Sequence, residues 1–353
     1  MILPGTYTAA LIVLIVGMIG WGMWANLFKA AGNKWRFELF YFDFAVGAFL
    51  AATIIALTLG SLGFDGFSFR DDLQLAGKRQ DVFAFGGGVI FNLGNMLLLA
   101  GVSISGMSVA FPAGMGFGLI IAALWNWFLN PGGNVSLLLI GAAAVAAAIV
   151  FDVLAFKTWS ALRAKAQAEK AQAEGVPVKP RRRKPGLKGV FLSLAGGFLL
   201  GSFYPLLQLG AAGDNGLGPY SSGFIFAIGI VFSTFVYNLF FMNLPVQGKP
   251  IEIAEYFRAS LRRHVMGLLG GIVWYAGLIA ILVRSRLEGA SLPGAPLSYA
   301  IQQSAILVAA LCGLLLWREF SGADFSVKLR LGLMFVLLIA GIGAMSASMA
   351  MAR

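Results

Sequence analysis

The dominant feature of this sequence is a succession of apolar runs, each about as long as a membrane-spanning helix. Ten such runs follow one another, at 7–28, 37–59, 82–102, 107–128, 135–156, 189–209, 220–242, 265–283, 297–317 and 331–350. A helix of ~20 residues crosses the ~30 Å hydrocarbon core of a bilayer with its backbone fully hydrogen-bonded. The alternating apolar and polar pattern of a membrane barrel is absent. The sequence therefore predicts an all-α membrane protein with ten transmembrane helices.

A single basic stretch, Lys157–Lys188, interrupts this apolar chain. It carries ten Lys and Arg residues against only Glu169 and Glu174, with five apolar runs before it and five after it. We interpret residues 1–156 as a first five-helix repeat, 157–188 as a linker and 189–353 as a second five-helix repeat. Within the linker, Ala161–Glu174 has a helix-forming composition, whereas the proline-rich Gly175–Pro185 does not.

The distribution of basic residues predicts which side of the membrane the linker occupies. If the linker is cytoplasmic, 20 of the 26 Lys and Arg residues lie on that side, as the positive-inside rule requires. Both termini are then outside. Membrane orientation thus explains the net charge of +11, and no nucleic-acid partner is expected. Clustered basic residues beside a span also favour contact with anionic lipid headgroups.

The two halves resemble each other in sequence. Gly87–Gly94 aligns with Gly270–Gly277, and Phe42–Gly47 aligns with Phe224–Gly229. Because each half has an odd number of spans, the second copy must be inverted relative to the first. Inverted repeats are typical of secondary transporters, which bind substrate near the midplane between the repeats.

One carboxylate, Asp43, lies within a predicted span. Such a residue is costly in lipid and should face the protein interior, where it could carry a coupling proton. The alternative is a structural carboxylate bonded to neighbouring helices. We interpret Asp152 and Glu319 as charges at span boundaries, and His264 as an interfacial residue.

The repeat also suggests a substrate site, because positions related by its pseudo-two-fold axis converge. Amides among aromatic rings suit a small, neutral polar solute. The predicted substrate-binding residues are Trp24, Asn92, Asn95, Tyr204, Trp274, Tyr275, Gln302 and Gln303. The alternative is that the amides only join helices.

No chemical motif indicates an enzyme or a cofactor. Cys312 is the only cysteine, so no thiol pair can bind a metal. The linker lacks a phosphate-binding G-x4-G-K-[ST] loop, which argues against ATP-driven transport. We expect no catalytic residues and no cofactor, with a proton as the coupling ion.

Several segments resemble one known family. Tyr41–Phe44, Gly94-Asn95, Gly106–Val109 and Asn126–Asn130 are similar to elements of the ureide permeases, which belong to the drug/metabolite transporter superfamily. The glucose/ribose porters and the L-rhamnose-proton symporter have a similar layout. The resemblance implies the drug/metabolite transporter fold and proton-coupled uptake of allantoin, a related ureide or a nucleobase.

The leading hypothesis is therefore a proton-coupled importer of a small neutral polar metabolite of the ureide, nucleobase or sugar class. We expect it in the plasma (inner) membrane. The same fold could instead export amphipathic drugs or metabolites. A membrane scaffold or receptor is a third possibility, weakened by the lack of a soluble domain and by an intramembrane carboxylate that it would not need.

Overall fold

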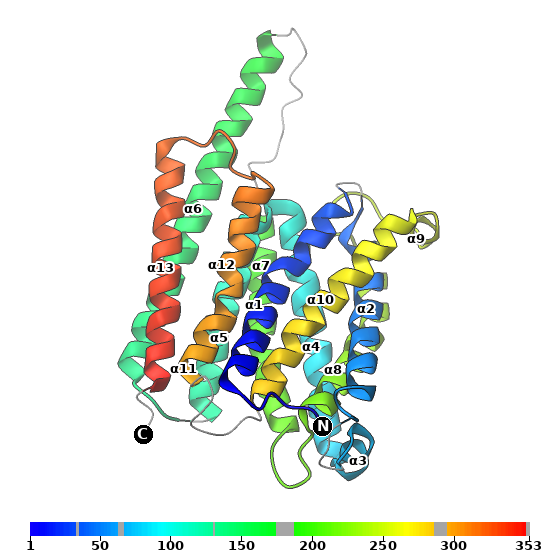
Figure 1. Ribbon diagram of the computed structural model, residues 1–353. Coiled ribbons are helices and arrows are strands. Elements are labelled where there is room, and N and C mark those ends of the chain that lie inside the picture. Colours follow the sequence, from blue (N-terminus) through cyan, green and yellow to red (C-terminus); the bar gives the residue numbers. More distant parts are fainter. Residues whose placement is uncertain (33–34, 63–66, 130, 174–186, 286–294, 351–353) are drawn as a thin grey trace.

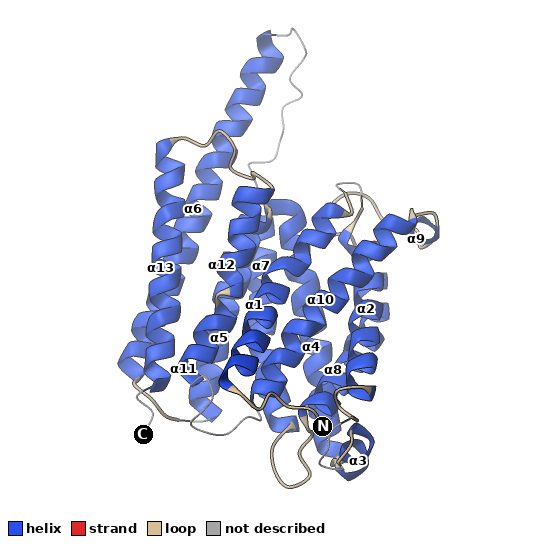
Figure 2. Ribbon diagram, viewed as in Figure 1, coloured by secondary structure: helices blue, strands red, loops and turns tan. Residues whose placement is uncertain are grey.

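The computed structural model describes residues 1–353 except 33–34, 63–66, 130, 174–186, 286–294 and 351–353. The described residues form helices joined by turns and loops, with no strand (Figure 2). The elements are α1 (Tyr7–Ala30), α2 (Phe37–Leu57), α3 (Phe69–Leu75), α4 (Lys78–Ser105), α5 (Met107–Leu129), α6 (Val135–Ala173), α7 (Lys188–Gly210), α8 (Pro219–Asn243), α9 (Ala254–Phe257), α10 (Leu261–Ser285), α11 (Ala295–Gln303), α12 (Ala305–Leu311), the π-helix η1 (Cys312–Leu316) and α13 (Phe325–Ala350).

Ten helical segments are long and apolar enough to cross a membrane, five before the linker and five after it. This confirms the prediction of an all-α protein with ten candidate spans. The start of α1 and the end of α13 lie at one end of the bundle, whereas the far end of α6 projects from the other (Figure 1). We call these the termini end and the linker end.

The helix α6 continues well beyond the apolar run that predicted it. Its 39 residues end at Ala173, so the alanine- and lysine-rich first part of the linker is helical, as its composition predicts. The remainder, Gly175–Pro185, lies outside the described residues.

Glycines let the central helices approach one another closely, and two of these contacts match across the halves. A Cβ on Gly88 would stand less than 3.0 Å from the backbone oxygen of Phe226, which joins α4 to α8. A Cβ on Gly271 would stand equally close to the backbone oxygen of Phe44, which joins α10 to α2. The sequence alignment pairs Gly88 with Gly271 and Phe44 with Phe226. Close helix packing through small residues is typical of membrane proteins.

The ninth predicted span is less regular than its apolar run suggests. The structure divides it into α11, α12 and η1, with an interruption at Ser304. The Ser304 hydroxyl donates to the backbone oxygen of Ala300 at 2.7 Å. Gln302 and Gln303 therefore stand beside a helix break.

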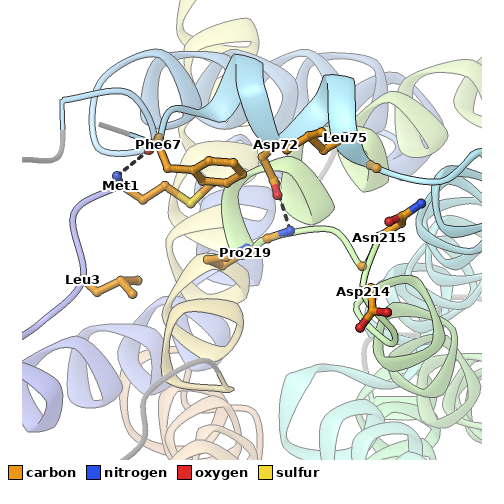
Figure 3. Close-up of a pocket in the computed structure, with 11 residues that line it drawn as sticks. Met1, Leu3, Phe67, Asp72, Leu75, Asp214, Asn215 and Pro219 are labelled. Atoms are coloured by element: carbon orange, nitrogen blue, oxygen red, sulfur yellow. Dashed lines mark hydrogen bonds between the residues drawn. The ribbon is translucent and has the colours of Figure 1, made fainter. Parts of the chain in front are cut away.

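The short helix α3 at the termini end is absent from the predicted set of spans. A capping box precedes it, in which Ser68 and Asp71 exchange hydrogen bonds. These bonds hold the pKa of the Asp71 carboxyl below its usual range. Asp72 accepts from the backbone N–H of Gly218 at 2.8 Å, so α3 is fixed to the start of α8 beside a surface pocket of about 310 Å³ (Figure 3).

Candidate substrate cavity

A cavity with a volume of about 580 Å³ lies within the helix bundle. Its lining comes mainly from α1, α4, α5, α7, α10 and α11, so both halves of the chain contribute. Gly132, Arg284 and Met349 also line it, and they lie at or beyond the termini-end limits of α5, α10 and α13. The cavity therefore extends from the centre of the bundle towards the termini end.

Six of the eight predicted substrate-binding residues line this cavity: Trp24, Asn95, Tyr204, Trp274, Gln302 and Gln303. They come from five different helices and converge only in the folded chain. The structure brings these side chains together, and their role in binding remains a prediction.

Aromatic rings form one wall of the cavity. Phe91 of α4 and Trp274 of α10 stack with their ring centroids 4.2 Å apart and their planes inclined by 29°. Trp24 lies next to this pair, with Phe44 bridging Trp24 to Trp274 at centroid distances of 5.0 and 5.9 Å. Flat, rigid faces of this kind suit a planar ligand, since stacked rings attract beyond simple burial.

Amides and hydroxyls supply the polar lining. Asn95 donates from Nδ2 to the Tyr41 hydroxyl at 3.1 Å, which fixes the orientation of its amide. The buried Tyr299 hydroxyl has no hydrogen-bond partner among the described residues. The charged lining residue is Arg284, whose Nε donates to the Ser298 hydroxyl at 3.0 Å near the termini end.

Asn92 and Tyr275 do not line the cavity. Asn92 is fully buried and donates to the Ser233 hydroxyl at 2.7 Å and the Thr234 hydroxyl at 3.0 Å, so it joins α4 to α8. Tyr275 is also fully buried, and its hydroxyl packs against Gly223 of α8. Asn92 follows Phe91 in the sequence, and Tyr275 follows Trp274. Successive residues of a helix are rotated by about 100°, so these two side chains point away from the cavity that the preceding rings line.

The sequence interpretation missed several polar lining residues. Gln208 lies one helical turn after Tyr204 in α7, and Tyr299 lies one turn before Gln302 in α11. Residues three or four apart share a helix face, so this spacing could have identified both. Arg284, near the termini end of α10, is another polar lining residue that the interpretation missed.

Asp43 lies outside the cavity, near the linker end of α2. It accepts hydrogen bonds from the Tyr256 hydroxyl at 2.6 Å and is 2.9 Å from Nδ1 of His264. Burial and the bond to Asp43 raise the pKa of the Tyr256 hydroxyl above its usual value, so it remains a donor. His264 is thus a direct partner of Asp43, a more specific role than the predicted interfacial one. The carboxylate ties α2 to α9 and α10.

Taken together, ten membrane-spanning segments around a central cavity lined from both halves define a polytopic membrane protein built like a solute carrier. The ureide permease family model matches residues 40–190. Ureide permease 1 of Arabidopsis thaliana is 22% identical over 96% of this chain and 97% of its own length. Ureide permease 3 of the same plant is 24% identical over 70% of this chain and 74% of its own length.

One solved crystal structure, described only as that of a protein, supports the fold. It covers 96% of both chains with a TM-score of 0.51 and 13% sequence identity. In sequence, this chain is therefore similar to the ureide permeases. Because these relatives are permeases, the prediction of a multi-pass membrane transporter rather than an enzyme is confirmed.

Proposed function

We propose that this chain is a secondary active transporter that imports a small neutral polar solute of the ureide, nucleobase or sugar class. The observation that carries the proposal is the central cavity, where stacked rings face Gln302 and Gln303 at the break between α11 and α12. Broken helices at midplane sites are common in transporters because they free polar groups to bind substrate.

The lining favours ureides and nucleobases within that range. Both are planar or nearly so and present several N–H donors and carbonyl acceptors. An amide side chain can both donate to and accept from such a ligand, and the Phe91 and Trp274 pair offers a flat face. The names of the permease relatives point to ureides.

We also infer that the chain is an inverted repeat with the drug/metabolite transporter fold and works by alternating access. The matched contacts of Gly88 with Phe226 and of Gly271 with Phe44 support the repeat. The cavity extends to the termini end, while Lys29 and Glu319 form an ion pair at the linker end. With the linker in the cytoplasm of a plasma membrane, this geometry is the one expected of the outward-facing state of an importer.

Proton coupling through Asp43 is part of the proposal. Its carboxylate is 4% exposed and lies where α2, α9 and α10 meet. A proton on this carboxyl would remove an acceptor from Tyr256 and His264 and so loosen the joint between these helices.

The test is a panel of ligands scored by thermal stabilisation of the purified protein, followed by uptake into proteoliposomes. A ligand that binds only the folded state raises the apparent melting temperature with its concentration. We expect ureides or nucleobases to stabilise the protein and an inward proton gradient to drive their accumulation. Stabilisation by amphipathic amines alone, with none by ureides, nucleobases or sugars, would contradict the proposal and favour the exporter.

A further inference from the structure

The linker end contains a junction centred on the carboxylate of Glu319. Its oxygens accept from the backbone N–H groups of Met107 at 2.8 Å and Ser108 at 2.7 Å, at the start of α5. The same carboxylate pairs with the ammonium of Lys29, at the end of α1. Gly106 and Gly313 make room for it, because a Cβ on either would stand 2.7 Å from a carboxylate atom.

The chain around Glu319 departs from regular helix. The π-helix η1 directly precedes this segment, and Arg318 has a φ of 49°, which a residue with a side chain rarely adopts. Such irregularities gather at functional sites. Trp317 donates to the Asn26 side chain at 2.7 Å, and Trp159 of α6 donates to the backbone oxygen of Glu319 at 3.0 Å. The segment therefore joins α1, α5 and α6.

Asp152 of α6 is the unexplained group beside this junction. It is 0% exposed, and neither carboxylate oxygen has a hydrogen-bond partner among the described residues. The interpretation of Asp152 as a charge at a span boundary does not fit this side chain, because a charge at such a boundary is solvated or paired. An ionised carboxylate without a partner is very costly inside a protein, so the neutral acid is the form that fits this site.

Charged side chains near Asp152 would influence whether its carboxyl group ionises. Glu319 is the group whose charge acts on it, from the segment after η1. Lys29 of α1 is paired with Glu319. Arg330 of α13 donates to the backbone oxygen of Leu154, two residues after Asp152 in α6, and to the hydroxyl of Thr158. The start of α5 contributes backbone N–H groups rather than side-chain charge.

We propose that Asp152 is a second proton-binding site, which holds its proton while Lys29 and Glu319 close the linker end and releases it when that end opens. On opening, entering water accepts the proton and the O–H electron pair stays on the carboxylate. This inference rests on the proposed transport cycle but does not involve Asp43.

The direction of the pH effect follows from linkage. The closed state binds the proton more tightly than the open state, so the closed state is favoured at low pH. The preference for the closed state is complete below the pKa of Asp152 in the open state and is lost as the pH rises from that pKa to the higher pKa of Asp152 in the closed state. One proton can shift the equilibrium by at most about tenfold per pH unit.

Cys312 provides a reporter of this opening. It is the only cysteine in the chain, it begins η1, and it is half-buried. The rate of labelling by a membrane-impermeant maleimide is measured across the pH range in wild type and in Asp152→Asn. Dividing one rate by the other at each pH removes the reagent's dependence on thiol ionisation.

We expect the wild-type rate to rise several-fold relative to Asp152→Asn as the pH increases, and the neutral amide to keep the end closed. Lys29→Met and Glu319→Gln should label rapidly at all pH values, because each removes the ion pair; either variant alone suffices if the other does not fold. A ratio independent of pH, or one that follows sodium concentration instead, would overturn the proposal.

Infrared spectroscopy gives an independent measurement. We expect the carbonyl band of a buried carboxylic acid at neutral pH in wild type and its loss in Asp152→Asn; identical spectra would also overturn the proposal. Ligand stabilisation of the same preparations separates this test from the proposed function. Failure of ureides, nucleobases and sugars to bind would count against that function, whereas a flat labelling ratio with intact binding would count against Asp152 alone.

Discussion

Phe91 and Trp274, which the sequence alignment pairs across the two halves, stack on each other with ring centroids 4.2 Å apart. Their contact lies between α4 and α10 and forms a wall of the central cavity. Residues related by a two-fold axis meet in this way only when they lie close to it. In the proposed transporter, substrate that contacts this stacked pair would touch both halves of the chain.

Trp274→Ala should weaken binding of the transported solute by roughly two- to tenfold. An aromatic pair contributes about 0.5–1.5 kcal/mol beyond area burial, and 1.4 kcal/mol corresponds to about a tenfold change in affinity. Isothermal titration with a stabilising ligand measures the change. Trp274→Phe keeps a ring on Phe91 and should retain most of the affinity; equal losses in both variants would mean that stacking is not the cause.

Gln303→Ala should lower ligand affinity by roughly two- to tenfold with little loss of thermal stability, since one neutral hydrogen bond contributes about 0.5–1.5 kcal/mol. Asn92→Ala is the matched control. Its amide joins α4 to α8 outside the cavity, so its loss should lower the melting temperature and leave affinity unchanged. If Asn92→Ala lowered affinity and Gln303→Ala did not, the binding site would lie around α8 instead.

Gly88→Ala should destabilise the fold by about 1–3 kcal/mol, the usual cost of overpacking a close contact. The added methyl group would meet the backbone oxygen of Phe226, which cannot move aside without displacing α8. Gly86→Ala in the same helix is the control, because a Cβ there meets nothing within 4 Å. Thermal unfolding in detergent compares the two, and similar melting temperatures would show that α4 and α8 are less tightly packed.

Asp43→Asn should abolish accumulation driven by a proton gradient while leaving exchange of labelled for unlabelled solute intact. The amide preserves the shape of the side chain but cannot take up a proton. Tyr256→Phe, which removes one hydrogen bond to Asp43, should shift the pH dependence of uptake without abolishing it. If Asp43→Asn still accumulated solute in response to a proton gradient, Asp43 would not be the residue that carries the coupling proton.

The sequence by itself determined the class of fold. Apolar runs long enough to cross a bilayer predict helices almost independently of what surrounds them, because lipid offers the backbone no other hydrogen-bond partners. All ten candidate spans follow from this rule. The interruption at Ser304 could not be predicted in this way, because the apolar run continues through it.

Only the tertiary structure decided which polar residues face the cavity. Asn95 and Asn92 are the same residue type one turn apart, yet Asn95 lines the cavity and Asn92 bonds to α8. Hydropathy cannot distinguish them, because every face of a membrane helix is apolar and neighbouring helices determine its rotation. The same holds for Asp152 and Glu319, whose relationship arises because α6 and the segment after η1 pack together across more than 150 residues of sequence.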